Sequence, residues 1–197
     1  QATCATQKLP ANADYQLHAS LLHHAYSVCR YFIPSNLQVN SDQTQIIYQQ
    51  GSQSTYETKG SHFSTLGRDE KRTFTLNIAI SASRALLPFQ AIFKGKTTAS
   101  LPAKNSLSHD KANQLGFLFE HSGTDNYWAN LKMMKSFVTN LLAPYFTATK
   151  EHLGLDPLQE CMWQLDVWSI HTSLEFRTWI FNNYPWIILD YVPGGCT

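Results

Sequence analysis

The chain has 197 residues, of which 43% are hydrophobic and 13% aromatic, with a formal net charge of +1. This length and composition predict a folded globular domain with its own core and exclude a disordered chain. The small net charge argues neither for nor against a nucleic-acid partner, because a local basic groove can lie within a neutral total.

The cysteines and the apolar runs indicate which compartments and partners to expect. Cys4, Cys29, Cys161 and Cys196 are widely spaced and form no zinc-binding pattern, so a reduced intracellular setting is the simplest interpretation and a disulfide the less favoured one. No run of about 18 apolar residues and no signal-peptide pattern is present, so we expect no membrane partner. The chain starts without Met and stops soon after an apolar run, and we expect it to be a fragment at both ends.

The predicted elements follow from apolar spacing. Residues 1–35 are expected to form a mostly helical lead-in, with a helix capped at Asp14 and ended by Pro34. Further along the chain we expect three strands, a helix, a strand, a helix and a strand. Their ranges are 37–48, 71–81 and 85–94 for the strands, 126–150 for a helix bent at Pro144, 162–167 for a strand, 173–183 for a helix, and 186–192 for the last strand, with a polar loop at 95–115.

Two aspartates interrupt otherwise strand-like runs. Asp42 lies in the first predicted strand and Asp166 in the fourth. A carboxylate buried without a partner costs several kcal/mol, so such residues are seldom there for packing. Paired carboxylates from two strands are a typical site for Mg²⁺ or Mn²⁺ that acts on phosphates. The alternative is that one or both cap a turn or pair with a lysine.

Three other features are weaker candidates. His171, just after the fourth strand, could contact a phosphate or orient a water, or could simply precede a helix capped by Thr172 or Ser173. Asp190 in the last strand is a third acidic candidate, although a structural hydrogen bond explains it better. His23 and His24 are adjacent, so we expect a solvated or interfacial role rather than shared metal binding.

A charge cluster precedes the second strand at residues 67–72. A solvated loop is the simpler interpretation, and contact of Arg68, Lys71 or Arg72 with DNA phosphates is the sharper one. The five tryptophans are expected in the core rather than as platforms for bases. They are Trp128, Trp163, Trp168, Trp179 and Trp186.

The motifs around these residues resemble the DDE superfamily endonuclease domain of pogo-like and jerky-like transposases, which has many copies in fungal genomes. The resemblance runs from about residue 37 to the end of the chain, and the combination of motifs is more specific than any one. The motifs are Val39-Asn-Ser-Asp-Gln-Thr-Gln45, Gly67-Arg-Asp-Glu-Lys-Arg-Thr-Phe-Thr75, Leu87-Pro-Phe-Gln-Ala-Ile-Phe-Lys-Gly95, Trp163-Gln-Leu-Asp-Val-Trp-Ser-Ile-His171 and Ile187-Ile-Leu-Asp-Tyr-Val-Pro-Gly-Gly-Cys-Thr197.

The resemblance implies an α/β fold with an RNase H-like mixed sheet over residues 36–197, after the lead-in of residues 1–35. It implies two-metal phosphoryl transfer on DNA, a nuclear location, and an acidic triad whose first two members map onto Asp42 and Asp166. The third member follows the Pro-Gly-Gly-Cys-Thr motif in the family, so it lies beyond Thr197, and Asp190 does not take its place. Arg84 stands where the family pattern has a hairpin glycine.

Two functions follow as hypotheses. The leading one is a metal-dependent endonuclease that cleaves DNA or transfers strands in the complete domain, with the 197-residue chain alone expected to be inactive. The alternative is a domesticated or degenerate domain that binds DNA or protein without catalysis. The sequence does not decide whether the domain forms a homo-oligomer. The third alternative is an intracellular α/β domain in which the two strand aspartates are incidental and form no site.

Overall fold

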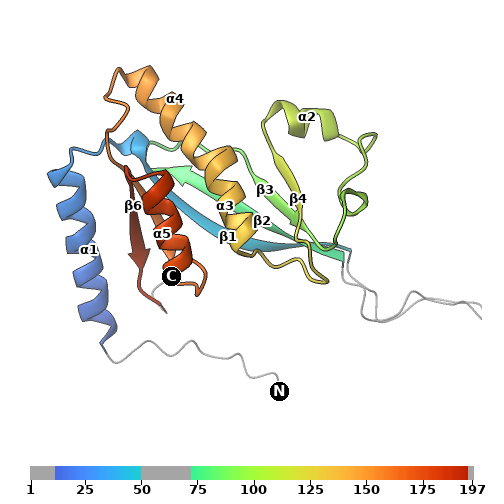
Figure 1. Cartoon of the computed structure of the whole chain (residues 1–197), viewed down its shortest axis with the longest axis horizontal. Coiled ribbons are helices and arrows are strands. Elements are labelled where there is room, and N and C mark those ends of the chain that lie inside the picture. Colours follow the sequence, from blue (N-terminus) through green and yellow to red (C-terminus); the bar gives the residue numbers. More distant parts are fainter. Residues whose placement is uncertain (1–11, 50–71, 195–197) are drawn as a thin grey trace, which may run out of the picture. The chain divides into compact units, whose positions relative to one another are not determined.

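The computed structural model describes residues 12–49 and 72–194. Within these ranges six strands form a mixed sheet in the order β4-β3-β2-β1-β5-β6 (Figure 1). The predicted α/β class is confirmed. The strands are β1 Gln38–Gln49, β2 Arg72–Ser81, β3 Gln90–Phe93, β4 Leu118–His121, β5 Cys161–Asp166 and β6 Ile187–Val192.

None of the helices in the described ranges is long and apolar enough to cross a membrane. They are α1 Ala13–Arg30, α2 His109–Gln114, α3 Leu131–Phe137, α4 Ala143–Leu153 and α5 Leu174–Asn183, with short turns η1 Ser35–Leu37, η2 Thr98–Ser100 and η3 Val138–Leu142.

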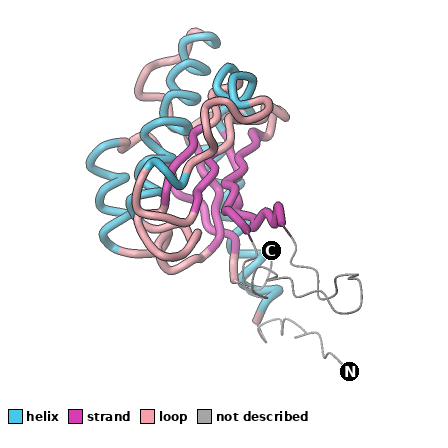
Figure 2. The backbone as a smooth tube through the Cα atoms, turned by 90° about the vertical axis from the view of Figure 1, so that its right-hand side faces the viewer, coloured by secondary structure: helices cyan, strands magenta, loops and turns pink. Residues whose placement is uncertain are grey.

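The chain divides into two compact units, and β1 and β2 run through both. The described part of the first unit comprises residues 12–42, 78–89 and 130–194, and that of the second comprises 43–49, 72–77 and 90–129. Figure 2 shows the strands and helices along the backbone. Each unit has its own packing.

In the first unit, β1, β5 and β6 are parallel neighbours. Val39 pairs with Trp163, and Trp163 pairs with Leu189. Because side chains alternate along a strand, Val39 and Trp163 enter the core below α3 and α5, where Trp163 packs against Phe137 and Phe176. The opposite face of β6 meets α1, which lies alongside it in Figure 1. Both faces of this part of the sheet are therefore covered by helices.

The helix predicted at 126–150 is divided in the structure. α3 begins only at Leu131, where the Asn130 side chain accepts a hydrogen bond from the Met133 N–H. A single π turn, η3, separates it from α4, which carries Pro144 in its first turn. Proline has no N–H to donate to the preceding turn, so the wider π turn is the physical form of the predicted bend.

The second unit contains a strand that the sequence did not predict. β4 pairs in parallel with β3, with Ala91 opposite Phe119, while β3 runs antiparallel to β2. The stretch predicted as a polar loop contains η2 and α2. Phe74 and Phe93 stack with ring centroids 4.9 Å apart, and this pair anchors the small core of the unit.

Other local predictions had mixed outcomes. α1 is present, but its N-cap position is Asn12, and Asp14 lies in the first turn. Of the two caps predicted for α5, Thr172 and Ser173, the structure has Ser173, whose hydroxyl oxygen accepts from the Phe176 N–H at 3.2 Å. Trp128, which was expected in the core, is instead 60% exposed. Among the described residues, Cys29 and Cys161 are free thiols.

Candidate functional site

The two predicted aspartates lie on adjacent parallel strands of the sheet, Asp42 within β1 and Asp166 at the end of β5. The paired register of β1 and β5 joins Gln38 to Met162 and continues to Asn40 and Gln164. Asp42 and Asp166 each come two residues after this last pair, so alternation places Asp42 on the face of Asn40 and Asp166 on the face of Gln164. Neighbouring strands lie about 4.8 Å apart, so this register favours carboxylates within reach of one cation.

Neither aspartate is buried, so the expected cost of burying a carboxylate without a partner does not arise at either. Asp42 is exposed, and the Asp166 side chain is 47% exposed at the end of β5. The cost of burying a carboxylate applies instead to Asp190, whose side chain is 1% exposed. Exposed carboxylates are accessible to a cation or to a phosphate group, so exposure suits the predicted chemistry better than burial would.

Asp190 is the buried member of a polar row on the face covered by α1. Its carboxylate accepts hydrogen bonds from Gln164 Nε2 at 3.0 Å and from His24 Nδ1 at 2.8 Å, with His23 Nδ1 at 3.4 Å. Gln164 Oε1 accepts in turn from Asn40 Nδ2 at 3.3 Å. The row therefore gives Asp190 a structural role, and gives the two histidines the interfacial role that was expected.

This row was missed from the sequence, although a signal was present. Polar residues occupy alternate positions, Gln38, Asn40 and Asp42 in β1, and Gln164 and Asp166 in β5. That alternation marks one face of each strand as polar before any register is known. A cavity of about 330 Å³ borders the row, with Leu21 and His24 of α1 among its lining residues.

His171 lies directly behind Asp166. Its Nδ1 is 2.7 Å from Asp166 Oδ1 and 3.2 Å from the Asp166 backbone oxygen. The residue is only 4% exposed and packs edge-on against Trp168. A phosphate could reach this ring only after it became exposed. The predicted contact of His171 with nucleic acid stays a prediction.

The structure describes only part of the basic charge cluster at residues 67–72. Arg68 and Lys71 lie outside the described residues, and Arg72 is the first residue of β2. Their contact with DNA phosphates stays a prediction.

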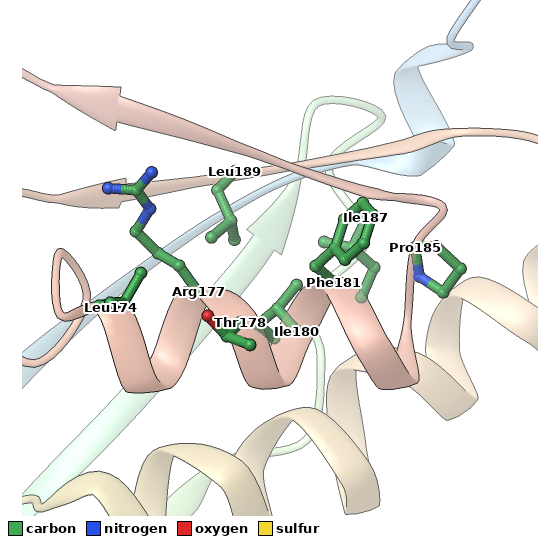
Figure 3. Close-up of a pocket in the computed structure, with 8 residues that line it drawn as sticks. All are labelled: Leu174, Arg177, Thr178, Ile180, Phe181, Pro185, Ile187 and Leu189. Carbon is green, nitrogen blue, oxygen red and sulfur yellow. The ribbon is translucent and has the colours of Figure 1, made fainter.

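A second concavity, between α5 and β6, is unsuited to this chemistry. It measures about 360 Å³ and is mainly apolar, with Arg177 the one charged residue among those that line it (Figure 3). Leu189 lines it, on the face of β6 opposite Asp190. The groove contains no carboxylate.

The described residues include no group of three or more His, Cys, Asp or Glu side chains arranged to hold a metal ion. The fit to a cation therefore rests on two carboxylates. Carboxylate oxygens suit Mg²⁺ and Mn²⁺, and Mg²⁺ is commonly held by one or two carboxylates together with waters and substrate phosphates. The donor set of Asp42, within β1, and Asp166, at the end of β5, fits such an ion in its chemistry.

This arrangement of strands and helices defines an RNase H-like mixed α/β fold. No family model matches the sequence, and no curated protein matches it either. Solved structures of Mos1 transposase share the fold. A pre-cleavage Mos1 transpososome superposes with a TM-score of 0.51 at 10% identity, covering 99% of this chain and 48% of that chain.

Two further structures are similar. A Mos1 transposase paired-end complex with the left transposon end gives a TM-score of 0.50 at 10% identity, covering 99% of this chain and 46% of that chain. A Mos1 mariner paired-end complex with Mn gives 0.49 at 10% identity, covering 100% and 46%. This chain spans about half the length of the Mos1 chains. At such low identity the likeness establishes the fold and no more.

Proposed function

We propose that this chain is a nucleic-acid-binding, DDE-type endonuclease domain of the transposase kind. Asp42 and Asp166 hold Mg²⁺ or Mn²⁺, and the substrate is a DNA phosphodiester. The observation that carries the proposal is the placement of the two aspartates just past the last paired residues of adjacent parallel strands in an RNase H-like sheet. Resemblance of the surrounding motifs to pogo-like and jerky-like transposases supports the same assignment.

The acidic and the basic residues have different roles in this proposal. The carboxylates of Asp42 and Asp166 bind the cation between β1 and β5. Such an ion, when bound, supplies Lewis-acid activation of the attacking and leaving oxygens of a phosphodiester. Arg68, Lys71 and Arg72 hold the DNA backbone through its phosphates. A nuclear location goes with a DNA substrate and is part of the proposal.

A cation titration tests the site. Mn²⁺ binding is measured by electron paramagnetic resonance for the wild-type chain and for Asp42→Asn and Asp166→Asn. Each substitution keeps the side-chain shape and removes the charge, so the dissociation constant should rise at least about tenfold. Asp125→Asn is the matched control, because Asp125 is 84% exposed, pairs with Lys96 and lies in neither β1 nor β5. Unchanged binding in both site variants would sink the assignment.

A second candidate function is a relative that binds DNA or protein without cutting. It is favoured by Arg84, which has a positive φ of 71° where the family pattern has a hairpin glycine, a departure typical of a degenerate copy. Binding and cleavage of a DNA duplex in Mn²⁺ separate the two. Cleavage that disappears in Asp166→Asn supports the endonuclease, whereas binding that survives both aspartate substitutions, with no cleavage by any form, supports the binding domain.

A further inference from the structure

The contact between His171 and Asp166 indicates how the histidine serves the site. Its Nδ1 faces two acceptors, Asp166 Oδ1 at 2.7 Å and the Asp166 backbone oxygen at 3.2 Å, so this nitrogen carries a proton and donates. We propose that His171 is a positioning residue that fixes the Asp166 carboxylate by donating to Oδ1, which leaves Oδ2 for the divalent cation. This inference rests on the proposed function.

The imidazole is itself held in place. It is 4% exposed and packs against the rings of Trp163, Trp168 and Phe176, with centroids 6.3, 5.1 and 6.2 Å away. The Tyr191 hydroxyl donates to the His171 backbone oxygen at 2.8 Å, which ties the residue to β6. Rotation of the ring would break these contacts, so Nδ1 stays directed at Asp166.

The other ring nitrogen strengthens the assignment. His171 Nε2 is buried and has no hydrogen-bond partner among the described residues. A proton placed there would be an unsatisfied buried donor, whereas a proton on Nδ1 is shared between two oxygens of Asp166. The packing thus selects the tautomer in which the histidine donates to the carboxylate.

The half-exposed carboxylate at the end of β5 needs such a partner. A side chain that is 47% exposed can adopt several χ2 angles, and a cation must fix one of them. A hydrogen bond from a buried, immobile ring selects one orientation before the ion arrives. Partners of this kind behind a metal-binding side chain typically change metal affinity about 10- to 100-fold.

Substitutions at position 171 distinguish a donated hydrogen bond from simple packing. His171→Phe keeps a ring and removes the donor, so we expect the Mn²⁺ dissociation constant to rise about 10- to 100-fold. His171→Asn places an amide N–H near the position of Nδ1 and should restore most of the affinity. His171→Gln places its amide nearer to the position of Nε2 and should not. Thermal unfolding of each variant checks the fold.

The outcomes separate this inference from the proposed function. If Asp166→Asn weakens Mn²⁺ binding and His171→Phe does not, only the role of His171 fails. Equal affinities for the Asn and Phe variants also overturn it. If the wild-type chain binds no Mn²⁺, both proposals fall. A readout that needs no metal is the ¹⁵N resonance pattern of His171 in the wild-type chain, where we expect the proton on Nδ1; a proton found on Nε2 would overturn the inference.

Discussion

His24 and Asp190 join the first helix to the last strand of the sheet. His24 Nδ1 lies 2.8 Å from Asp190 Oδ2, and the carboxylate is 1% exposed. The two residues are 166 positions apart in the chain, so this contact closes the first unit across nearly its whole sequence. Ser20 reinforces it through its hydroxyl, which donates to the Tyr191 backbone oxygen at 3.0 Å.

The adjacent histidines allow a matched comparison of stability. His24→Ala removes the shorter hydrogen bond to a buried charge, so we expect a loss of about 1.5–3 kcal/mol in the free energy of unfolding. His23 is 59% exposed and its Nδ1 is 3.4 Å from the same carboxylate, so His23→Ala should cost less than about 1 kcal/mol. Urea denaturation measures both, and equal losses would contradict the distances.

Arg84 offers a stabilising substitution. Its φ is 71°, in the left-handed region, and its N–H donates to the Ser81 backbone oxygen within a tight turn. This conformation costs a residue with a Cβ about 1–2 kcal/mol, and glycine adopts it without that cost. Arg84→Gly should therefore raise the free energy of unfolding by about 0.5–1 kcal/mol. Arg84→Ala keeps the Cβ and is the control: the explanation is wrong if it stabilises the chain equally.

The cysteines should differ sharply in reactivity. Cys161 is fully buried, and burial raises the pKa of its thiol to about 12, although the nearby Lys150 acts in the opposite direction. Only the thiolate is nucleophilic, so Cys161 should resist iodoacetamide in the folded chain at pH 8–9 while exposed Cys29 reacts. Peptide mass spectrometry gives the modified fraction at each position. Equal labelling of the two in the folded chain would be the contrary result.

The same shift predicts a pH dependence of stability. The ordinary thiol pKa is 9.0, so between pH 9 and about 12 the unfolded thiol loses its proton while the folded one keeps it. Stability contributed by the protonated thiol is therefore complete below pH 9 and is lost as the pH rises towards 12. Cys161→Ala should show a shallower decline over this range in urea denaturation; a decline as steep as that of the wild type would place its origin elsewhere.

The sequence predicted the elements with long, regular patterns and missed those that depend on pairing. Alternation over residues 71–81 located β2, and a long strand-like run located β1. Apolar spacing after a predicted cap at Thr172 or Ser173 located α5. β4 has only four residues, too few for alternation to stand out, and it exists because β3 offers an edge. Leu174 follows the apolar spacing of α5 and still lies exposed, because spacing does not reveal what covers a face.

The candidate site, too, was predictable from the sequence only in part. The motifs around Asp42 and Asp166 pointed to both residues, and the strand pattern put each on a strand. That their strands are neighbours in parallel register depends on tertiary pairing, which local pattern does not contain. The hydrogen bond from His171 to Asp166 could not be predicted from the sequence either. His171 was visible as a polar residue after a strand, but its direction is set by the aromatic rings around it.

Ser41 and Trp163 provide a test of the β1–β5 register that supports the site. The Trp163 indole N–H donates to Ser41 Oγ at 2.8 Å, and both residues are buried. Ser41→Ala leaves this donor unsatisfied, so we expect a loss of about 1–3 kcal/mol in the free energy of unfolding. Trp163→Phe removes the donor, and Ser41→Ala in that background should cost much less.

Urea denaturation of the four forms gives the coupling energy, which should be at least about 1 kcal/mol if the two strands pair in this register. Additive losses in the two single variants would mean that the indole and the hydroxyl do not interact, and would remove the register argument for bringing Asp42 and Asp166 together.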